Sequence, residues 1–288
     1  MGQRRASKPQ AVINTNVAIN IFLMTQLLTT DNNPTTLYKY RSWSDDLQKR
    51  LITHQEVYFA RPSSFNDPFD GNIPVRWDLL TYDDCFQKNL ELTQIIHKDK
   101  TLEIQKQIAK QLTDSKKLWH PDNIKKESQD AIAKWDKLIG LLSLSEKRDD
   151  ILMWSHYSDF HRGFVVGLRV NSLLEDYDFD YLKRVEYQGK YPIITGHHET
   201  TERFETKFFT KSSAWEYEKE WRISKNHIDN RVMKIKKQTF SEIILGCQMT
   251  EKVKAEVIEM IKKTFGATVT VYQAIKADEK FGLEMRPV

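Results

Sequence analysis

The stretch that decides the fold runs from residue 151 to residue 169 and reads ILMWSHYSDFHRGFVVGLR. Its apolar residues first recur at helical spacing behind Asp150, an acidic residue of the kind that favours the start of a helix. Gly163 stands at the expected end of that helix, since glycine tolerates the left-handed backbone that closes many helices. Residues 164–168 then read as a short buried strand. A helix followed at once by a strand predicts a fold that mixes α and β structure.

The expected helix carries several chemically capable side chains. Trp154, Tyr157 and His161 fall at positions i, i+3 and i+7, which would place them on one face. Ser155 and Asp159 would share another face. Tryptophan and tyrosine at helical spacing are often core aromatics, and a histidine at a helix end is often a cap. A packing interpretation therefore stands beside the interpretation as a site.

A second unusual cluster, WEYEKEWR, occupies residues 215–222. Glu216, Glu218 and Glu220 alternate, so on an extended segment their carboxylates would point to one side. Repulsion among these carboxylates would raise the pKa of one member into the range needed for general acid or base chemistry. The alternative is a structural ion pair between Glu218 or Glu220 and Arg222.

A third cluster, FNDPFD, occupies residues 65–70. Asn66 and Asp67 precede a proline and fit a turn, because their side chains bond to their own backbone. Arg41, at the end of a strand predicted over residues 37–41, would suit a phosphate group, since a guanidinium binds phosphate in a forked geometry.

Strands and helices mix along the rest of the chain. One α+β domain over residues 37–288 is the simplest architecture, with a helical insertion at about residues 82–137. Residues 1–36 are expected to form an N-terminal extension, whose apolar stretch over residues 17–28 is too short to span a bilayer. Further strands are predicted at residues 57–60, 138–144, 185–187, 221–223, 240–245 and 267–273, and further helices begin near residues 44, 200 and 250.

The composition describes a globular chain of 288 residues with 40% hydrophobic and 11% aromatic residues. Its net charge of +4 is a small excess of 44 basic over 40 acidic residues, so a nucleic-acid partner is permitted but not favoured. Cys85 and Cys247 lie far apart, which gives no disulfide framework and no zinc knuckle. A cytoplasmic location without a membrane partner fits these features.

Several common catalytic motifs are absent from the sequence. The chain lacks GxGxxG, GxxxxGK[ST], GxSxG and HExxH, the marks of dinucleotide-binding, P-loop, hydrolase and zinc-protease sites. His197, His198 and Glu199 invite a metal site, but neighbouring helical residues point about 100 degrees apart and no third ligand is suitably spaced. No metal is therefore predicted.

The three clusters together, at residues 65–70, 153–163 and 215–222, resemble a widespread bacterial family of domains of unknown function. The order of elements also resembles the ADP-ribosyltransferase superfamily: a first strand bearing a basic residue, a strand with a Ser-x-Ser end followed by an aromatic helix, and a late strand preceded by Glu-x-Glu. This second resemblance implies a central, mainly antiparallel split sheet and NAD as a substrate.

The resemblance also implies residues for a cofactor pocket. Arg41, or Lys39 beside it, would hold the pyrophosphate or ribose of NAD. Ser143 and Ser145 would line the nicotinamide pocket, and the ring of Tyr157 would border it.

It likewise implies catalytic residues. Glu220 would stabilise the positive charge that grows on the ribose as nicotinamide leaves, much as carboxylates do in glycosidases. Glu218 would orient the acceptor. Trp154 and Asn66 are expected as further cofactor contacts, and His156 as a further catalytic candidate.

Three functional hypotheses follow. The leading one is an ADP-ribosyltransferase-like enzyme that uses NAD, as a bacterial toxin or phage-defence effector, and modifies a protein or nucleic acid. The second is an acid/base or metal-dependent hydrolase, such as a nuclease, built on His156, Asp159, His161 and Glu220. The third is a non-enzymatic binding module whose recognition surface consists of Trp154, Tyr157, Trp215 and Trp221.

Overall fold

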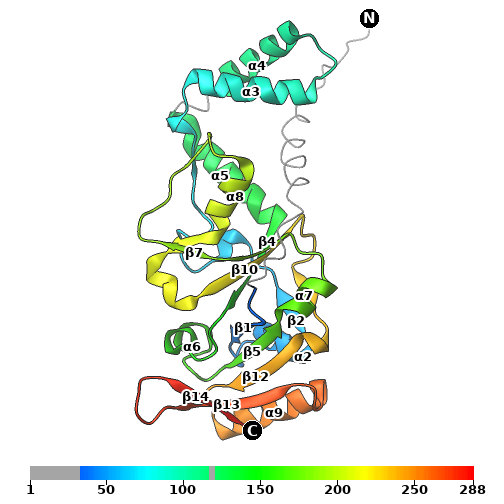
Figure 1. Ribbon diagram of the computed structural model, residues 1–288, viewed down its shortest axis with the longest axis vertical. Helices are drawn as coiled ribbons and strands as arrows, with labels where there is room; N and C mark the ends of the chain where they lie inside the picture. The colour runs from blue at the N-terminus through cyan, green and yellow to red at the C-terminus, as the bar shows by residue number, and fades with distance from the viewer. Residues whose placement is uncertain (1–32, 117–120) are drawn as a thin grey trace, which may run out of the picture.

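The computed structural model of the protein describes residues 33–116 and 121–288 (Figure 1). Most of the expected N-terminal extension, including its apolar stretch over residues 17–28, lies outside the described residues. Every helix within the described ranges is too short or too polar to cross a membrane.

The centre of the fold is one open sheet of eight strands in the order β14-β13-β12-β5-β1-β4-β10-β6. Neighbouring strands are antiparallel except for β12 and β13, which are parallel. A parallel pair needs a crossover, which α9 provides here. The α+β class and the mainly antiparallel sheet are thus confirmed. The strands are β1 (Thr36–Arg41), β4 (Ile139–Ser145), β5 (Phe164–Arg169), β6 (Tyr181–Arg184), β10 (Glu220–Asn226), β12 (Phe240–Leu245), β13 (Thr270–Lys276) and β14 (Leu283–Pro287).

Both faces of this sheet are covered by helices because apolar side chains on its central strands point to both sides. Val166 and Ile243 pack into one cluster, whereas their neighbours Val165 and Ile244 pack into another on the opposite face. The first cluster is completed by α2 (Asp46–Thr53), α7 (Val170–Asp176) and α9 (Glu251–Phe265). The other face is covered by α6 (Ile151–Tyr157) and α8 (Thr200–Phe209), which pack over different strands.

The sheet is weakly joined between β1 and β4. These two strands share one register pair, Tyr38 with Ser145, whereas β1 pairs with β5 along its whole length. At the other end of β4, Leu141 pairs instead with Ala60, which follows β2 (Glu56–Tyr58). The sheet is a single open sheet, although β1 and β4 separate beyond this single pair.

Three two-stranded ribbons flank the main sheet. They pair β2 with β11 (Val232–Lys234), β3 (Val75–Arg76) with β8 (Ile194–Thr195), and β7 (Glu186–Gln188) with β9 (Thr210–Ser212). Short 3₁₀ helices are η1 (Pro62–Ser64), η2 (Trp77–Leu79), η3 (Ser213–Glu218) and η4 (Lys237–Thr239).

Three helices occupy the stretch between β3 and β4, where the sequence predicts a helical insertion. They are α3 (Tyr82–Ile96), α4 (Leu102–Lys116) and α5 (Pro121–Leu138). Figure 1 shows α3 and α4 side by side at one end of the molecule, away from the sheet, with α5 leading back toward β4. The Tyr82 hydroxyl donates to Asp114 Oδ1 at 2.9 Å, so the start of α3 lies next to the end of α4.

The aromatic helix is shorter than the sequence indicates. α6 ends at Tyr157, and Asp159, Phe160 and His161 all adopt positive φ angles of 48°, 51° and 67°. Residues in this region cannot continue a right-handed helix. The prediction that His161 and Asp159 extend the helical faces is therefore wrong, although the turn still stacks His161 on Trp154, with ring centroids 6.3 Å apart.

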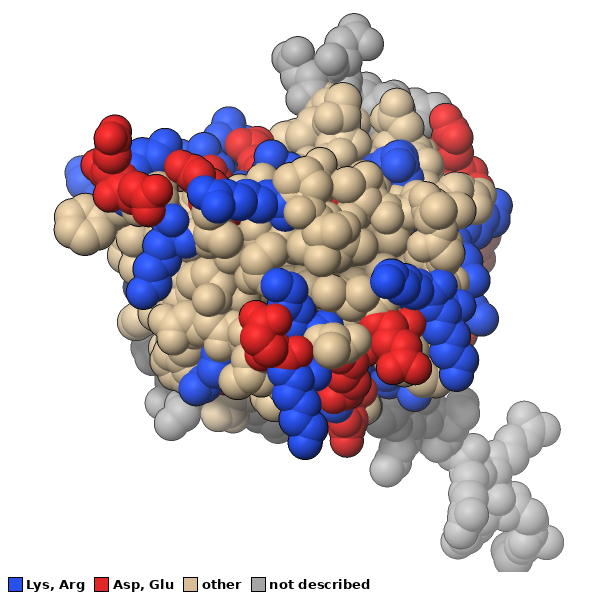
Figure 2. Space-filling model, turned by 90° about the horizontal axis from the view of Figure 1, so that it is seen from below, with Lys and Arg blue, Asp and Glu red and all other residues tan. Residues whose placement is uncertain are grey.

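Charge is mixed on the end of the molecule that carries α9, β13 and β14. Figure 2 shows basic and acidic side chains interspersed there around an uncharged area. This face therefore lacks the continuous basic surface typical of nucleic-acid-binding proteins.

Candidate functional site

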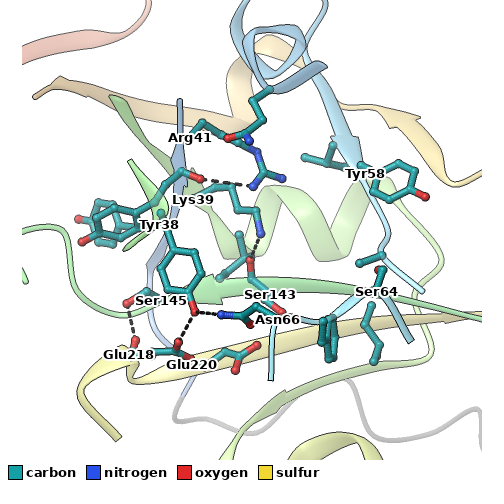
Figure 3. Close-up of a pocket in the computed structure, with 18 of the residues that line it drawn as sticks. Tyr38, Lys39, Arg41, Tyr58, Ser64, Asn66, Ser143, Ser145, Glu218 and Glu220 are labelled. Carbon is teal, nitrogen blue, oxygen red and sulfur yellow. Dashed lines mark hydrogen bonds between the residues drawn. The ribbon is translucent and has the colours of Figure 1, made fainter. Parts of the chain in front are cut away.

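A pocket of about 610 Å³ opens where β1 and β4 separate (Figure 3). This volume lies within the range of small-molecule sites. Side chains from β1, the loop after β2, β4, α6 and the start of β10 converge on it. The residues of this pocket that the sequence predicts are Lys39, Arg41, Asn66, Ser143, Ser145, Tyr157, Glu218 and Glu220.

One wall of the pocket is basic. The Arg41 guanidinium donates to the carbonyl of Tyr40 at 3.3 Å and forms no ion pair with any described residue. Burial lowers the pKa of Arg41 to about 10, which leaves it charged at neutral pH. A guanidinium without a carboxylate partner at a pocket wall is suited to bind an anion.

Lys39 stands beside Arg41 on the same wall. Its Nζ donates to the carbonyl of Ser143 at 2.5 Å, at the point on β4 where β1 has moved away. The lysine thus provides a hydrogen-bond donor for a backbone carbonyl near the gap between the two strands. Burial, reinforced by the Arg41 charge, lowers the pKa of Lys39.

The opposite wall is acidic and is shaped by a turn at Lys219. η3 ends at Glu218, Lys219 takes a left-handed conformation with φ of 44°, and β10 begins at Glu220. The prediction that the glutamates alternate along an extended segment is therefore wrong. Glu216 pairs instead with Lys219 at the surface, at 3.0 Å.

Two hydrogen bonds fix this turn against the sheet. Ser145 Oγ donates to the carbonyl of Glu218 at 2.6 Å, and the backbone N–H of Glu220 donates to the Tyr187 hydroxyl at 2.8 Å. As a result the two carboxylates approach the same ammonium group, Lys211 Nζ, which lies 2.6 Å from Glu218 Oε2 and 3.3 Å from Glu220 Oε2.

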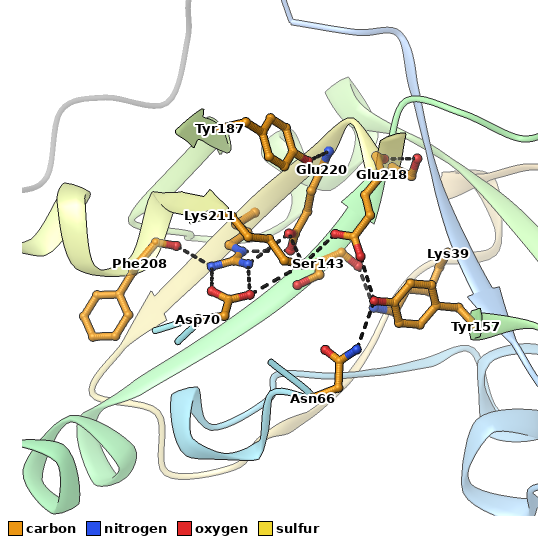
Figure 4. Close-up of polar contacts among 12 residues, drawn as sticks. Lys39, Asn66, Asp70, Ser143, Tyr157, Tyr187, Phe208, Lys211, Glu218 and Glu220 are labelled. Carbon is orange, nitrogen blue, oxygen red and sulfur yellow. Dashed lines mark hydrogen bonds and ion pairs between the residues drawn. The ribbon is translucent and has the colours of Figure 1, made fainter. Parts of the chain in front are cut away.

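A buried network of charges stands behind this wall (Figure 4). Arg222, whose side chain is 1% exposed, binds Glu220 with Nε at 2.7 Å and Nη2 at 2.9 Å. The same guanidinium binds both carboxylate oxygens of Asp70, at 2.8 Å and 2.6 Å. Lys211 Nζ lies 3.5 Å from Asp70 Oδ2. The network therefore contains Asp70, Glu218 and Glu220 against two cations, Lys211 and Arg222.

The two glutamates have pKa values shifted in opposite directions. Burial raises the pKa of Glu218; the Lys211 charge opposes this and the repulsion from Glu220 adds to it, so the net shift is upward. Burial acts in the same sense on Glu220, but the Arg222 and Lys211 charges outweigh it and hold its pKa at about 2. Two carboxyl groups with diverging pKa values are the usual arrangement for separate acid/base and electrostatic roles.

Tyr157 completes the acidic wall. Its hydroxyl donates to Glu218 Oε1 at 2.6 Å and accepts from Asn66 Nδ2 at 3.2 Å. Burial and the Glu218 charge raise the pKa of this phenol, which therefore remains a donor. Glu218 is thus held by Tyr157 on one oxygen and by Lys211 on the other.

Two predicted site residues lie outside the pocket. Trp154 is fully buried in the core under α6, where its Nε1 donates to the carbonyl of Arg148 at 2.9 Å. His156 is exposed and contacts the rings of Trp215 and Tyr217. Tyr157 packs against the same apolar cluster as Trp154, but only Tyr157 reaches the pocket.

The residues of the hydrolase hypothesis do not come together. His161 Nε2 lies 3.0 Å from Ser155 Oγ, Asp159 pairs with Arg162 at 2.9 Å, and Glu220 is held in the charge network. Within the described ranges, no group of three histidine, cysteine or acidic side chains is placed to hold a metal ion. Of the expected aromatic recognition surface, Trp154 and Trp221 are buried.

Sequence reasoning missed Asp70 and Lys211 as site residues. Asp70 belongs to the FNDPFD cluster, but the sequence alone assigns it no role. Its partner Arg222 is distant in sequence. Lys211 follows α8 in the short strand β9 and has no local signature. The possible pairing of a glutamate with Arg222 was anticipated, and Glu220 makes it.

Comparison with known proteins gives one match. A family model described as a protein of unknown function, DUF2971, matches residues 153–223, which extend from α6 into β10. The matched segment contains Tyr157, Glu218 and Glu220, and the expected resemblance to an uncharacterised family is confirmed. No curated protein and no solved structure matches the chain. The family match brings no activity with it, so the resemblance to ADP-ribosyltransferases stays a prediction.

Proposed function

We propose that this protein is an NAD-using enzyme that transfers ADP-ribose to an acceptor in the pocket between β1 and β4. The observation that carries the proposal is the division of one pocket into a basic wall and an acidic wall. Arg41 on the basic wall forms no ion pair within the described part of the chain, and Glu218 and Glu220 form the acidic wall. A dinucleotide such as NAD needs both features, an anion site for its pyrophosphate and a carboxylate near the ribose that reacts.

The basic wall would bind the pyrophosphate. The Arg41 fork can make paired hydrogen bonds to phosphate oxygens, and Lys39 adds a second donor beside it. Tyr58, which lines the outer part of the pocket and is half exposed, offers a ring on which a base can stack. The nicotinamide end would then lie toward Ser143, Tyr157 and Glu218.

The reaction breaks the bond between C1′ of the ribose and the nitrogen of nicotinamide. Nicotinamide leaves as a neutral molecule with the bonding electrons, and positive charge develops on the ribose. A nucleophilic O–H or N–H of the acceptor forms the new bond to C1′, and its proton passes to a carboxylate. The negative charge of that carboxylate also stabilises the charge on the ribose.

The contacts of the two glutamates favour a different division of roles from the one that the resemblance implies. Both oxygens of Glu220 are bound by Arg222, and its low pKa makes it a fixed charge that does not accept protons. Glu218 has a raised pKa and bonds to Tyr157, which borders the pocket. We therefore assign proton transfer to Glu218, and we assign to Glu220 the role of a fixed charge that holds the acidic wall in place.

The test is incubation of the purified protein with NAD and a bacterial lysate, with measurement of free nicotinamide and of labelled adduct. The wild type should release nicotinamide, and Glu218→Gln should lose this activity while keeping its melting temperature. Arg41→Ala should instead abolish the stabilisation that NAD gives to the wild type. Glu259→Gln and Arg286→Ala, at exposed positions, are the matched controls. Absence of both nicotinamide release and an NAD-induced rise in melting temperature would overturn the proposal.

A further inference from the structure

A second pocket of about 310 Å³ lies on the other side of Asp70 and Lys211, which line both pockets. It is formed by the end of the FNDPFD loop, by the loop that follows β7, and by β9. Its size is at the lower end of the range for ligand sites, so it suits a single small group. The function proposed above gives this pocket no role.

The pocket contains a buried carboxylate that forms no ion pair with any residue that the structure describes. Asp67 is 7% exposed, and its Oδ1 accepts the backbone N–H of Phe69 at 2.9 Å. No lysine, arginine or histidine of the described residues forms an ion pair with it. Asp70, three residues later and equally buried, is held by Arg222 and Lys211. Burying a carboxylate without a partner is costly, so a cation bound beside Asp67 would stabilise the site.

Two exposed aromatic rings stand at the same pocket. Phe69 is 63% exposed and Tyr191 is 53% exposed, and their ring centroids lie 5.9 Å apart at an interplanar angle of 73°. Burial raises the pKa of Tyr191, and the charge of Asp67 contributes, which places that carboxylate close to the ring. Aromatic faces beside a carboxylate attract organic cations.

The charge around the pocket also favours a cation. The shared network holds three carboxylates and two cations, Asp67 adds one negative charge, and Lys190 at the rim adds one positive charge. Two acidic and two basic residues line the pocket itself, so the excess of one negative charge comes from Glu218 and Glu220, which stand behind it with Arg222. Thr210 and Ser212 on the opposite wall supply hydroxyl oxygens that can accept N–H donors.

We propose that this second pocket binds an alkylguanidinium or alkylammonium group, held by Asp67 and enclosed by Phe69 and Tyr191. The group can belong to a free amine or to a basic side chain of a protein. The proposal does not depend on the activity proposed for the first pocket, because Asp67, Phe69 and Tyr191 line only the second one.

The test is titration of the full-length protein with butylguanidinium, butylamine and the uncharged butylurea, followed by calorimetry. Both cations should bind, and butylurea should bind at least tenfold more weakly. Asp67→Asn should reduce the affinity for butylguanidinium at least tenfold, because asparagine keeps the acceptor for the Phe69 N–H but removes the charge. Asp229→Asn, in the loop after β10, is the control and should bind as the wild type does.

Two further measurements show where the cation binds and whether it belongs to a protein chain or to a free amine. Arg41→Ala, which alters only the first pocket, should bind butylguanidinium like the wild type, whereas Tyr191→Leu should bind it more weakly. A peptide with a central arginine that binds more tightly than butylguanidinium identifies a protein chain as the source, and equal affinities identify a free amine. Equal binding of butylguanidinium and butylurea, unchanged binding by Asp67→Asn, or no binding of either cation would overturn the proposal.

Discussion

Glu218 and Glu220 are two residues apart and have the same side chain, but their surroundings give them different properties. Glu220 receives two hydrogen bonds from Arg222 and a longer one from Lys211. Glu218 is bound by Lys211 and Tyr157, and of these two only Lys211 carries a positive charge. A carboxylate is stabilised more by positively charged neighbours than by neutral ones. Glu220 therefore stays ionised to low pH, whereas Glu218 binds a proton more readily.

This difference predicts different effects of the same substitution on stability. Glu220→Gln leaves the buried Arg222 with one carboxylate partner, Asp70, and we expect a loss of about 3 kcal/mol in the free energy of unfolding. Glu218→Gln removes a charge whose burial is already unfavourable, so we expect a change of about 1 kcal/mol or less. Urea unfolding at neutral pH measures both. A larger loss for Glu218→Gln would contradict the assignment of the fixed charge to Glu220.

The same prediction has a pH signature. The pKa of Glu220 is about 2 in the folded protein, below the value of about 4.3 for an unperturbed glutamate. Its contribution to stability is therefore present above about pH 4.3 and lost as the pH falls toward 2. The Glu220→Gln variant should show a flatter decline in melting temperature over this range than the wild type.

At the scale of elements, Gly163 controls how the turn after α6 meets β1. A Cβ atom on this residue would lie 2.2 Å from the carbonyl oxygen of Arg41 and 2.8 Å from Ser158 Oγ. Backbone atoms at such a distance must move, and Arg41 belongs to the basic wall of the first pocket.

We therefore expect Gly163→Ala to cost about 1–3 kcal/mol of stability and to weaken NAD binding through displacement of Arg41. Thermal melting with and without NAD measures both effects. Gly282→Ala is the matched control, because the nearest atom to its added Cβ is a lysine side-chain carbon at 3.7 Å. Equal melting temperatures for the two variants would show that the backbone accommodates a Cβ atom at Gly163 without a loss of stability.

The main elements were predictable from the sequence because their apolar residues follow one period over several positions. The strands β1, β4, β5, β10 and β12 and the helices α2 and α9 lie close to where the sequence predicts them. The turn at Lys219 was not predictable, since a non-glycine residue in a left-handed conformation has no sequence signature. The pairing of Asp70 with Arg222 was missed for another reason, because it joins segments that only the folded sheet brings together.

At the scale of the molecule, α3 and α4 form a hairpin at one end, away from the main sheet (Figure 1). The two helices pack on each other, with Asn89 Nδ2 donating to Thr113 Oγ1 at 2.9 Å between them. The contact of Tyr82 with Asp114 brings the two ends of the hairpin together, so a short linker can replace it.

We expect a variant in which a glycine and serine linker replaces residues 82–116 to fold and to keep the stabilisation by NAD. The reason is that none of these residues lines either pocket. Differential scanning calorimetry with and without NAD provides the measurement. A folded variant that no longer responds to NAD would show that the hairpin contributes to the first pocket.

Asp70 and Lys211 form a wall with a pocket on each side. Lys211 divides its charge among Asp70, Glu218 and Glu220, so a cation that approaches Asp70 leaves more of that charge to the glutamates. A ligand on one side therefore changes the electrostatic potential that a ligand on the other side meets. Thermodynamic linkage requires the effect to be mutual: the factor by which the first ligand alters the affinity for the second equals the factor in the opposite direction. We therefore expect the two proposed ligands to bind cooperatively through this shared wall.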